Sequence, residues 1–476
     1  MQVLITDPIG KVGTKTLKAA GLKIVEKIGA SAEELNKVLP KTDGWIVRSG
    51  TTVTRELMEA APQLKVVGRA GVGVDNIDIP EATLRGIVVM NTPGVNTVAA
   101  AEHTIALMLS LVRNVHRGHS SLIAGQWDRN ELVGSELRGK TLGVIGLGKV
   151  GSEVIKRLHG FGMDVIGYDP YIKAENYEFD YVKFCDVDRL FRESDIISLH
   201  VPLVDSTKDL VDLERLKSMK PSSFLINCAR GGVVNEQDLA VALEQGILAG
   251  AAVDVFESEP ALDTPLASAP NILLTPHLGA STQEAKEGVS MAVCEQVRDY
   301  LIHEKLNNAL NMPISDLTKL KEIQINLDLA ETMGKLQGQL NPRAIKKVHV
   351  ECAGTMDEAK PAALAFLKGL LNDRIPDRVN YINAETLAIE LGIGIEHSYT
   401  SDCGSYTNLI RTQVTGETDC TEIHGSVFEG NQIRLVNILG YEFDVTPYGT
   451  MLFARNKDVP GVIGKVGTML GKANVN

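Results

Sequence analysis

The sequence has 476 residues, and its 48 Lys and Arg against 60 Asp and Glu give a net charge of −12 at neutral pH. This acidic balance argues against nucleic-acid binding in general, because the phosphate backbone is bound by basic surfaces. The length is typical of about three domains, and 44% hydrophobic residues can fill several buried cores.

The six cysteines lie far apart, without CxxC pairs or the spacing of metal ligands. We therefore expect reduced thiols and no metal site. The N-terminus lacks the basic start and long apolar run of a signal peptide, and no segment reaches the roughly 20 apolar residues of a membrane span. These features predict a cytoplasmic protein that does not bind membranes.

The N-terminal part of the chain alternates short apolar runs with helical patterns. The runs predict the strands of a small parallel α/β domain and lie at 3–5, 45–47, 66–67 and 88–90. A helical pattern over 98–112 leads toward a second domain, and another over 281–302 can carry the chain back. We predict a discontinuous substrate-binding domain, 1–96 and 281–313, and a dinucleotide-binding domain over 97–280, with a cleft between them.

A glycine-rich turn follows the first strand expected in the second domain. The strand 141–145 leads into the sequence GLGKVG at 146–151, a helical pattern follows over 150–161, and a second strand at 162–168 ends at Asp169. A glycine motif alone is weak evidence. The order of strand, turn, helix, strand and acid is, however, typical of a dinucleotide-binding fold.

Each glycine of this turn has a physical reason. Gly146 allows a tight turn, Gly148 leaves room for a pyrophosphate to approach the backbone, and Gly151 lets helix and strand pack closely. Free amides at the start of the helix would hold the anion. Asp169 would accept hydrogen bonds from ribose hydroxyls and would repel a 2′-phosphate, which favours NAD over NADP.

Further apolar runs complete the second domain. They lie at 195–199, 223–227, 250–254 and 272–274 and suit a sheet that is buried on both faces. With the two strands around the glycine turn, they predict a doubly wound fold of six strands.

Beyond Pro313 the pattern changes to alternating apolar and polar residues, as in 347–351 and 433–438. The second of these runs follows a turn at 429–431, which predicts an antiparallel hairpin in an α+β module over 314–448. The last segment predicts a strand over 451–454 and then the start of a helix. Its GxxGxxG spacing does not match a second nucleotide motif.

Three polar residues follow strands of the second domain, where doubly wound sheets bind ligands. Arg230 follows 223–227, Glu259 follows 250–254 and His277 follows 272–274. Oxidation of an alcohol by NAD needs a base, and histidine titrates in the right range.

We therefore expect His277 to be the base, Glu259 to orient its ring, and Arg230 to hold a substrate carboxylate by two hydrogen bonds. Each residue alone would more often be a surface charge or a structural side chain. Their common position at strand ends beside a dinucleotide turn favours a shared site.

Other residues at the same strand ends could line the cofactor. Cys228 is interpreted as non-catalytic, because hydride transfer needs no nucleophile. Asp254 and His200 could contact the nicotinamide half, with a capping or packing role as an equal alternative. The expected NAD-binding residues are Gly146, Gly148, Lys149, Val150, Gly151, Asp169, His200, Val201, Pro202, Cys228, Ala229, Arg230, Asp254, His277, Gly279 and Ala280.

Several motifs together resemble the D-isomer-specific 2-hydroxyacid dehydrogenases. They are VGRAGVGVDNID at 67–78, GVIGLGKVG at 143–151, HVPL at 200–203, NCARGG at 227–232 and TPHLGA at 275–280. Their order and spacing are highly specific, and the resemblance covers essentially the whole chain. The chain is most similar to the long type of this family, which has an intervening module and a C-terminal ACT domain.

The resemblance implies NAD-linked interconversion of 3-phospho-D-glycerate and 3-phosphooxypyruvate, the entry to serine synthesis. It implies Arg230, Glu259 and His277 as the catalytic set, in agreement with the roles argued from the residues. It also implies that 449–476 is the first part of an ACT domain. The sites at which the family binds serine would then be largely missing, so serine feedback by that route is not expected.

The resemblance further implies a homodimer or homotetramer whose dimer core includes the helix at 98–112. Arg48 and Arg69 would be substrate contacts in the first domain, and Arg129 would reach the site of a partner subunit. A surface charge or a structural salt bridge is the alternative for each of these arginines.

Two other functions stay open. The nearer is another 2-hydroxyacid dehydrogenase that acts on glyoxylate, hydroxypyruvate or 2-oxoglutarate; the C-terminal module favours phosphoglycerate instead. The farther is a scaffold that senses NAD without turnover, against which the intact catalytic set argues.

Overall fold

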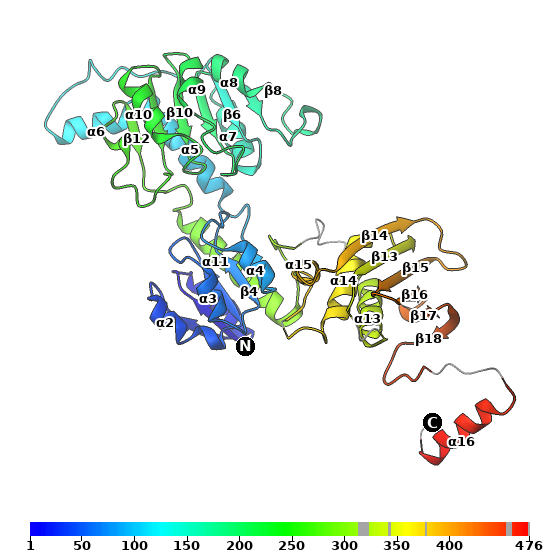
Figure 1. Ribbon diagram of the computed structural model, residues 1–476. Coiled ribbons are helices and arrows are strands. Elements are labelled where there is room, and N and C mark those ends of the chain that lie inside the picture. Colours follow the sequence, from blue (N-terminus) through cyan, green and yellow to red (C-terminus); the bar gives the residue numbers. More distant parts are fainter. Residues whose placement is uncertain (313–322, 341–343, 377, 454–458, 475–476) are drawn as a thin grey trace. The chain divides into compact units, whose positions relative to one another are not determined.

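The computed structural model describes residues 1–312, 323–340, 344–376, 378–453 and 459–474. Its strands form three sheets (Figure 1). The chain divides into two compact units, one of residues 1–78 and 89–310 and the other of residues 79–88 and 311–476. In the part of the chain that the structure describes, no helix combines the length and apolar character needed to cross a membrane.

The first sheet has five strands in the order β2-β1-β3-β4-β5. They are β1 (Gln2–Ile5), β2 (Lys23–Glu26), β3 (Gly44–Val47), β4 (Val66–Arg69) and β5 (Val88–Met90). The residues of β1 and β3 are buried throughout, as expected for parallel strands covered on both faces. The prediction omitted β2, because its flanking Lys23 and Glu26 are exposed and only its two middle residues are apolar.

Helices of this part of the chain are α1 (Lys11–Ala19), α2 (Ala32–Asn36), α3 (Arg55–Glu59) and α4 (Ile79–Leu84). The predicted return helix forms as α11 (Gln283–His303) and packs against α1, β3 and β4. The contact is close because β4 has a glycine there: a Cβ on Gly68 would lie 2.6 Å from a methyl group of Val297.

The second sheet has seven strands in the order β12-β11-β10-β9-β6-β7-β8. Its neighbouring strands pair in parallel, which confirms the doubly wound fold. They are β6 (Thr141–Ile145), β7 (Asp164–Tyr168), β8 (Val182–Phe184), β9 (Ile196–Leu199), β10 (Phe224–Asn227), β11 (Gly250–Val253) and β12 (Ile272–Leu274). The expected number of six strands was wrong, because β8 has only three residues and an exposed Lys183 interrupts its apolar pattern.

The helices in the part of the chain that forms the second sheet are α5 (Thr97–Val112), α6 (Val115–Ile123), α7 (Lys149–His159), α8 (Val187–Glu193), α9 (Leu213–Ser218) and α10 (Glu236–Glu244). Short 3₁₀ helices lie at Leu39–Lys41, Ala174–Asn176 and Pro265–Ser268. The chain leaves β6 toward one side of the sheet and resumes at β9 on the other side. The carboxyl ends of β6 and β9 therefore mark the topological switch point, where ligands bind in such folds.

The third sheet, in the later unit, is mixed, in the order β14-β13-β15-β16-β17-β18. It consists of β13 (Lys347–Gly354), β14 (Gly394–Thr400), β15 (Asn408–Thr415), β16 (Cys420–Phe428), β17 (Gln432–Ile438) and β18 (Tyr441–Val445). β13 pairs in parallel with β14, and the other pairs are antiparallel. The hairpin predicted around 429–431 is thus confirmed as β16 and β17.

Two helices, α13 (Gln324–Leu340) and α14 (Ala359–Leu371), pack against each other and against this sheet (Figure 1). Their backbones come close because a Cβ on Gly334 would lie 2.1 Å from the carbonyl oxygen of Phe366. The unit also contains α15 (Ala384–Glu390) and α16 (Val462–Lys472). The strand expected at 451–454 was wrong for 451–453, which pair with no described segment; residue 454 lies outside the described residues.

The segment 79–88 is part of this later unit. Asn380 donates from Nδ2 to the carbonyl oxygen of Gly86 at 2.6 Å, and Asn383 donates to that of Leu84 at 3.3 Å. The side chain of Leu84 packs against the hydrophobic core formed by α13, α14 and the mixed sheet. Hydrogen bonds and apolar burial therefore both hold this short segment in the later unit.

Candidate active site

The glycine turn after β6 has the geometry that its sequence predicts. Gly146 has φ of 94°, and a Cβ there would lie 2.4 Å from the carbonyl oxygen of His200. A Cβ on Gly151 would lie 2.1 Å from the carbonyl oxygen of Gly146. Around Gly148, in contrast, no atom lies within 4 Å of such a Cβ. The turn is thus tight where the chain packs on itself and open where a pyrophosphate would approach, so these residues fit a dinucleotide.

Lys149 and Val150 are the first residues of α7. Gly148 occupies the N-cap position and has no side chain to bond the first amides of the helix. These amides keep their donor capacity, which suits an anionic ligand.

Asp169 follows β7 and is tied to the turn. Its Oδ2 accepts a hydrogen bond from the amide of Leu147 at 2.9 Å, and its Oδ1 accepts one from the amide of Tyr171 at 2.9 Å. The structure therefore fixes this carboxylate beside the glycine turn, as the ribose-binding prediction requires. The ribose contact itself stays a prediction.

His200, Val201 and Pro202 follow β9, next to β6. The amide of His200 donates to the carbonyl oxygen of Ile145 at 2.7 Å, and Nε2 lies 2.8 Å from Oγ of Ser198. Burial lowers the pKa of His200 to about 4, so its ring is neutral at physiological pH. This histidine can line a cofactor but is a poor acceptor of a substrate proton.

Cys228 and Ala229 follow β10. Burial raises the pKa of the Cys228 thiol to about 12, so the thiolate required of a nucleophile does not form near neutral pH. This agrees with a non-catalytic interpretation of the cysteine.

Asp254, at the end of β11, is 1% exposed and organises the loop that carries His277. Its Oδ1 accepts hydrogen bonds from Oγ1 of Thr275 at 2.6 Å and from the amide of Leu278 at 2.7 Å, and its Oδ2 accepts one from the amide of Gly279 at 2.8 Å. Ala280 continues this loop. Asp254 thus caps this loop through hydrogen bonds, which fits the capping or packing alternative, and a contact with the cofactor stays a prediction.

The same carboxylate lies 3.1 Å from Nε2 of His103, on α5. Burial alone would raise the pKa of Asp254, but the hydrogen bonds from His103, Thr275 and Leu278 outweigh it and lower the pKa below its ordinary value. The sequence reasoning missed His103 and Thr275. Thr275 was within a recognised motif, whereas nothing in the pattern of α5 distinguished His103.

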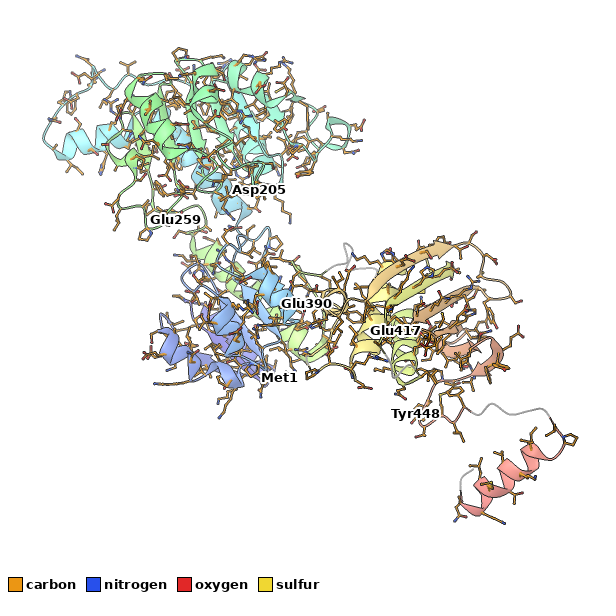
Figure 2. The ribbon with its side chains drawn as sticks, viewed as in Figure 1. Met1, Asp205, Glu259, Glu390, Glu417 and Tyr448 are labelled. Carbon is orange, nitrogen blue, oxygen red and sulfur yellow. The ribbon has the colours of Figure 1, made fainter. Side chains whose placement is uncertain are left out.

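Glu259 and His277 lie together. Oε2 of Glu259 is 2.8 Å from Nδ1 of His277, and Oε1 accepts a hydrogen bond from the amide of Phe256 at 3.2 Å. Figure 2 labels Glu259 in the loop beyond β11. Both side chains are partly exposed, His277 at 48% and Glu259 at 38%, so a substrate can reach them.

The backbone of His277 is in the left-handed region, with φ of 53°. Non-glycine residues seldom adopt this conformation, and they cluster at functional sites when they do. Its amide donates to the carbonyl oxygen of Asp254 at 2.9 Å, which helps to hold the unusual conformation.

Arg230 follows β10, and β10, β11 and β12 are neighbours in the sheet. Arg230, Glu259 and His277 therefore occupy consecutive loops at one edge. The Nη1 of Arg230 donates to the carbonyl oxygen of Ala229 at 2.7 Å, and Nε lies 3.8 Å from Oδ2 of Asp75. Asp75 is a second residue that sequence reasoning did not single out, although it lies in the motif at 67–78.

Arg48, Arg69 and Arg230 form a positively charged cluster. The pKa of Arg69 is lowered to about 10, first by burial and then by the positive charges of Arg230 and Arg48, against which Asp75 and Asp7 act. Within the described residues, the buried Nε of Arg69 has no hydrogen-bond partner. Neighbouring guanidinium groups with a buried N–H that lacks a partner are suited to bind an anionic ligand.

Glycines make room for these guanidinium groups. A Cβ on Gly71 would lie 1.6 Å from Nη1 of Arg69, and one on Gly73 would lie 2.7 Å from Nη2 of Arg230. The glycines of the 67–78 motif therefore allow two arginines to lie against the backbone. Arg129, in contrast, is on the exposed segment after α6, and no described contact joins it to this cluster.

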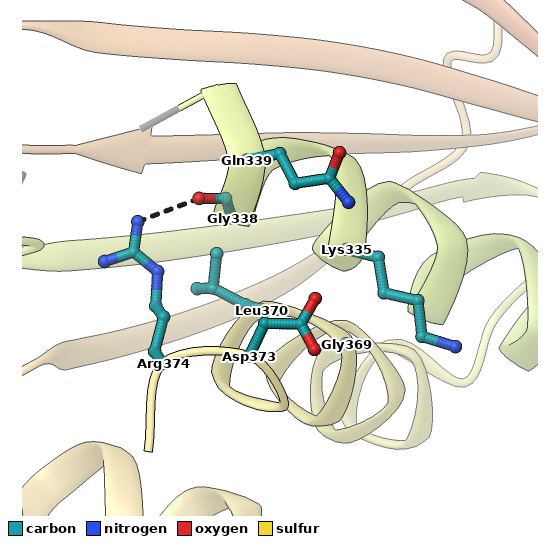
Figure 3. A pocket seen from close by; sticks show the side chains of 7 residues that line it. All are labelled: Lys335, Gly338, Gln339, Gly369, Leu370, Asp373 and Arg374. Atoms are coloured by element: carbon teal, nitrogen blue, oxygen red, sulfur yellow. Dashed lines mark hydrogen bonds between the residues drawn. The ribbon is translucent and has the colours of Figure 1, made fainter. Parts of the chain in front are cut away.

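A partly open cavity lies elsewhere, in the later unit. It has a volume of about 360 Å³ and lies between the C-terminal ends of α13 and α14, and Gly338 and Gly369 are among the residues that line it (Figure 3). Nη2 of Arg374 donates to the carbonyl oxygen of Gly338 at 3.1 Å and so caps α13. The described residues contain no group of three or more His, Cys, Asp or Glu side chains placed to hold a metal.

Comparisons with known proteins place the site in a family. A model of the D-isomer specific 2-hydroxyacid dehydrogenase NAD binding domain matches residues 105–279, and a model of the D-3-phosphoglycerate dehydrogenase intervening domain matches residues 322–439. Residues 105–279 are thus the NAD-binding domain of a D-isomer specific 2-hydroxyacid dehydrogenase, which confirms the predicted cofactor.

Relatives match the whole chain. D-3-phosphoglycerate dehydrogenase of Synechocystis sp. is 40% identical over 100% of this chain and 86% of its own length. That of Archaeoglobus fulgidus is 40% identical over 100% and 91%, and that of Bacillus subtilis is 38% identical over 100% and 90%. The chain belongs to the D-3-phosphoglycerate dehydrogenase family.

Solved structures match about two thirds of this chain. The NAD-dependent formate dehydrogenase of Staphylococcus aureus, in complex with NAD, has a TM-score of 0.59 and 32% identity and covers 65% of this chain and 98% of its own. D-lactate dehydrogenase of Aquifex aeolicus, complexed with NAD and lactic acid, has a TM-score of 0.56 and 30% identity and covers 63% and 95%.

Proposed function

We propose that this chain catalyses the NAD-dependent oxidation of 3-phospho-D-glycerate to 3-phosphooxypyruvate, the first step of L-serine synthesis. The observation that carries the proposal is the 2.8 Å contact between Glu259 and Nδ1 of His277. It leaves Nε2 of the ring for the substrate hydroxyl. The names of the full-length relatives support the choice of substrate.

His277 takes the hydroxyl proton at Nε2 during oxidation and returns it during reduction. Glu259 fixes the tautomer with hydrogen on Nδ1 and stabilises the imidazolium that forms. Arg230 holds the substrate carboxylate by two hydrogen bonds and so aims C2. When bound, NAD accepts the hydride from C2.

The arginine cluster supports a phosphorylated substrate. A simple 2-hydroxy acid has one carboxylate, which Arg230 binds. Arg48 and Arg69 add two further guanidinium groups, and a phosphate on the substrate is the second anion that these two groups can bind. We propose that these two arginines bind the phosphate. They discriminate this substrate from glyoxylate, hydroxypyruvate and 2-oxoglutarate.

We also propose a homodimer or homotetramer in the cytoplasm, with a dimer core that includes α5 and with Arg129 reaching the site of the partner subunit. Exposed apolar side chains on and after α6 support this surface: Leu122 at 61%, Ile123 at 74%, Trp127 at 80% and Val133 at 80%. We also propose the domain division predicted from the sequence, with a substrate-binding domain of 1–96 and 281–313 and a dinucleotide-binding domain over 97–280. Light scattering of the purified chain tests its oligomeric state, and a mass of one chain would contradict it.

The test of the proposed activity is NADH oxidation with 3-phosphooxypyruvate beside the three unphosphorylated acids. Wild type, His277→Ala and the exposed control His303→Ala are compared. We expect a strong preference for the phosphorylated acid, retained in the control and lost in His277→Ala. Preference for an unphosphorylated acid would overturn the choice of substrate, and NADH binding without any turnover would favour a scaffold.

A further inference from the structure

One side chain joins the loop that begins at Arg48, after β3, to the loop that follows Arg69, the last residue of β4. Nδ2 of Asn76, in the loop after β4, donates to the carbonyl oxygens of Arg48 at 2.7 Å and Thr51 at 2.5 Å. From the other side, Oδ2 of Asp7 accepts hydrogen bonds from the amides of the same two residues, at 2.6 Å and 3.2 Å. The segment 48–51 is thus held at both its carbonyls and its amides.

Backbone contacts reinforce this arrangement. The amide of Val53 donates to the carbonyl oxygen of Asn76 at 2.8 Å, and Val53 forms a parallel bridge with Ile77. Asp7 is only 6% exposed, and a Cβ on Gly50 would lie 2.4 Å from its Oδ1. Because Gly50 has no side chain, the Asp7 carboxylate can come close to the 48–51 segment.

We propose that Asn76 and Asp7 are positioning residues that set the separation of Arg48 and Arg69. By that separation they determine the preference for a phosphorylated over an unphosphorylated 2-hydroxy acid. This inference rests on the proposed function of the site. Neither residue touches the substrate; each acts through the backbone of the Arg48 loop.

The physical reason is the geometry of phosphate binding. Two guanidinium groups bind one phosphate well only when each can direct its N–H groups at a different pair of oxygens. A loop displaced by 1 Å loses much of that contact. Hydrogen bonds from Asn76 and to Asp7 resist this displacement, whereas Arg230, Glu259 and His277 lie on loops of the other sheet and keep their own supports.

The experiment measures kcat and KM with 3-phosphooxypyruvate and with hydroxypyruvate, which lacks the phosphate. Asn76→Ala removes the two donors. Asn36→Ala makes the same chemical change at an exposed position of α2 and is the matched control. Asp7→Ala removes the acceptor, whereas Asp7→Asn keeps an oxygen that can accept from both amides. Thermal melting and NADH affinity verify that each variant is folded.

We expect Asn76→Ala to raise KM for 3-phosphooxypyruvate about 10- to 100-fold, with kcat lowered less than about threefold. The ratio of kcat/KM between the two acids falls by a similar factor. Asp7→Ala behaves alike, Asp7→Asn restores most of the preference, and Asn36→Ala matches wild type.

An unchanged KM in Asn76→Ala, or an equal loss on both acids, would overturn the inference while leaving the proposed function intact. Wild type that does not turn over 3-phosphooxypyruvate would overturn the proposed function itself. The two failures are therefore distinguishable in one data set.

Discussion

Oε2 of Glu259 lies 2.8 Å from Nδ1 of His277, and the His277 backbone is held at φ of 53°. Two separate loops thus converge on one ring, one through a side chain and the other through an unusual backbone conformation. The orientation of this ring is the property on which the first prediction depends.

Glu259→Gln should lower kcat about 10- to 100-fold, because the amide no longer stabilises the imidazolium and can present the wrong group to Nδ1. The affinity for NADH should change little. Steady-state kinetics and NADH fluorescence titration check this. A kcat equal to that of wild type would contradict the assigned role.

Gly148 and Gly151 should respond differently to the same added methyl group. At Gly148 the added methyl group has open space and the backbone φ is −70°, so the melting temperature of Gly148→Ala should stay near that of wild type. The methyl group should, however, block the approach of the pyrophosphate and raise Kd for NADH about 10- to 100-fold through lost anion contacts. Gly151→Ala meets the Gly146 carbonyl oxygen and should lose about 1–3 kcal/mol of unfolding free energy. Equal destabilisation of the two variants would argue against the open approach to the turn.

Asp169→Ala should reduce the preference for NADH over NADPH. The carboxylate beside the turn repels a 2′-phosphate, so its removal should improve kcat/KM with NADPH relative to NADH about tenfold or more. The same assay with both cofactors measures the ratio. If the ratio does not change, Asp169 serves only the hydrogen bonds to Leu147 and Tyr171.

Asp254→Asn should cost about 1–3 kcal/mol of unfolding free energy at pH 7, because an amide cannot accept all the hydrogen bonds that converge on this position. The pKa of Asp254 is lowered in the folded state. Its stabilisation is therefore complete above the ordinary carboxyl pKa and is lost as pH falls through the lower, folded-state value.

Urea unfolding of wild type and Asp254→Asn across the acid range would measure this difference. The gap between the two proteins should narrow below about pH 4. A gap that widens on acidification would contradict the direction of the pKa shift.

Much of the fold could be predicted because buried parallel strands are continuous apolar runs. Val3–Ile5 and Ile196–Leu199 are examples, each buried throughout. β2 and β8 were missed because each is short and contains exposed charged residues, at both ends of β2 and in the middle of β8. In these strands the pairing with a neighbour, rather than local composition, decides the structure.

The candidate site was predictable for a similar reason. Arg230, Glu259 and His277 follow strands whose carboxyl ends meet at one edge, so position in the sequence predicts proximity. His103 and Asn76 act through contacts with segments distant in sequence, such as the Asp254 carboxylate for His103. Only the folded structure brings such partners together.

The hydrogen bonds of Asn380 and Asn383 to Gly86 and Leu84 have a consequence for anyone who shortens this protein. A fragment ending at residue 310 would keep the segment 79–88 but lose the residues against which Leu84 packs. Such a fragment would expose the apolar side chain of Leu84 and the carbonyl groups of Leu84 and Gly86, in the segment that follows the loop after β4. Residues 311–476 therefore cannot be removed without a cost to the segment 79–88. A shortened dehydrogenase made from this chain would need a polar side chain in place of Leu84 on α4.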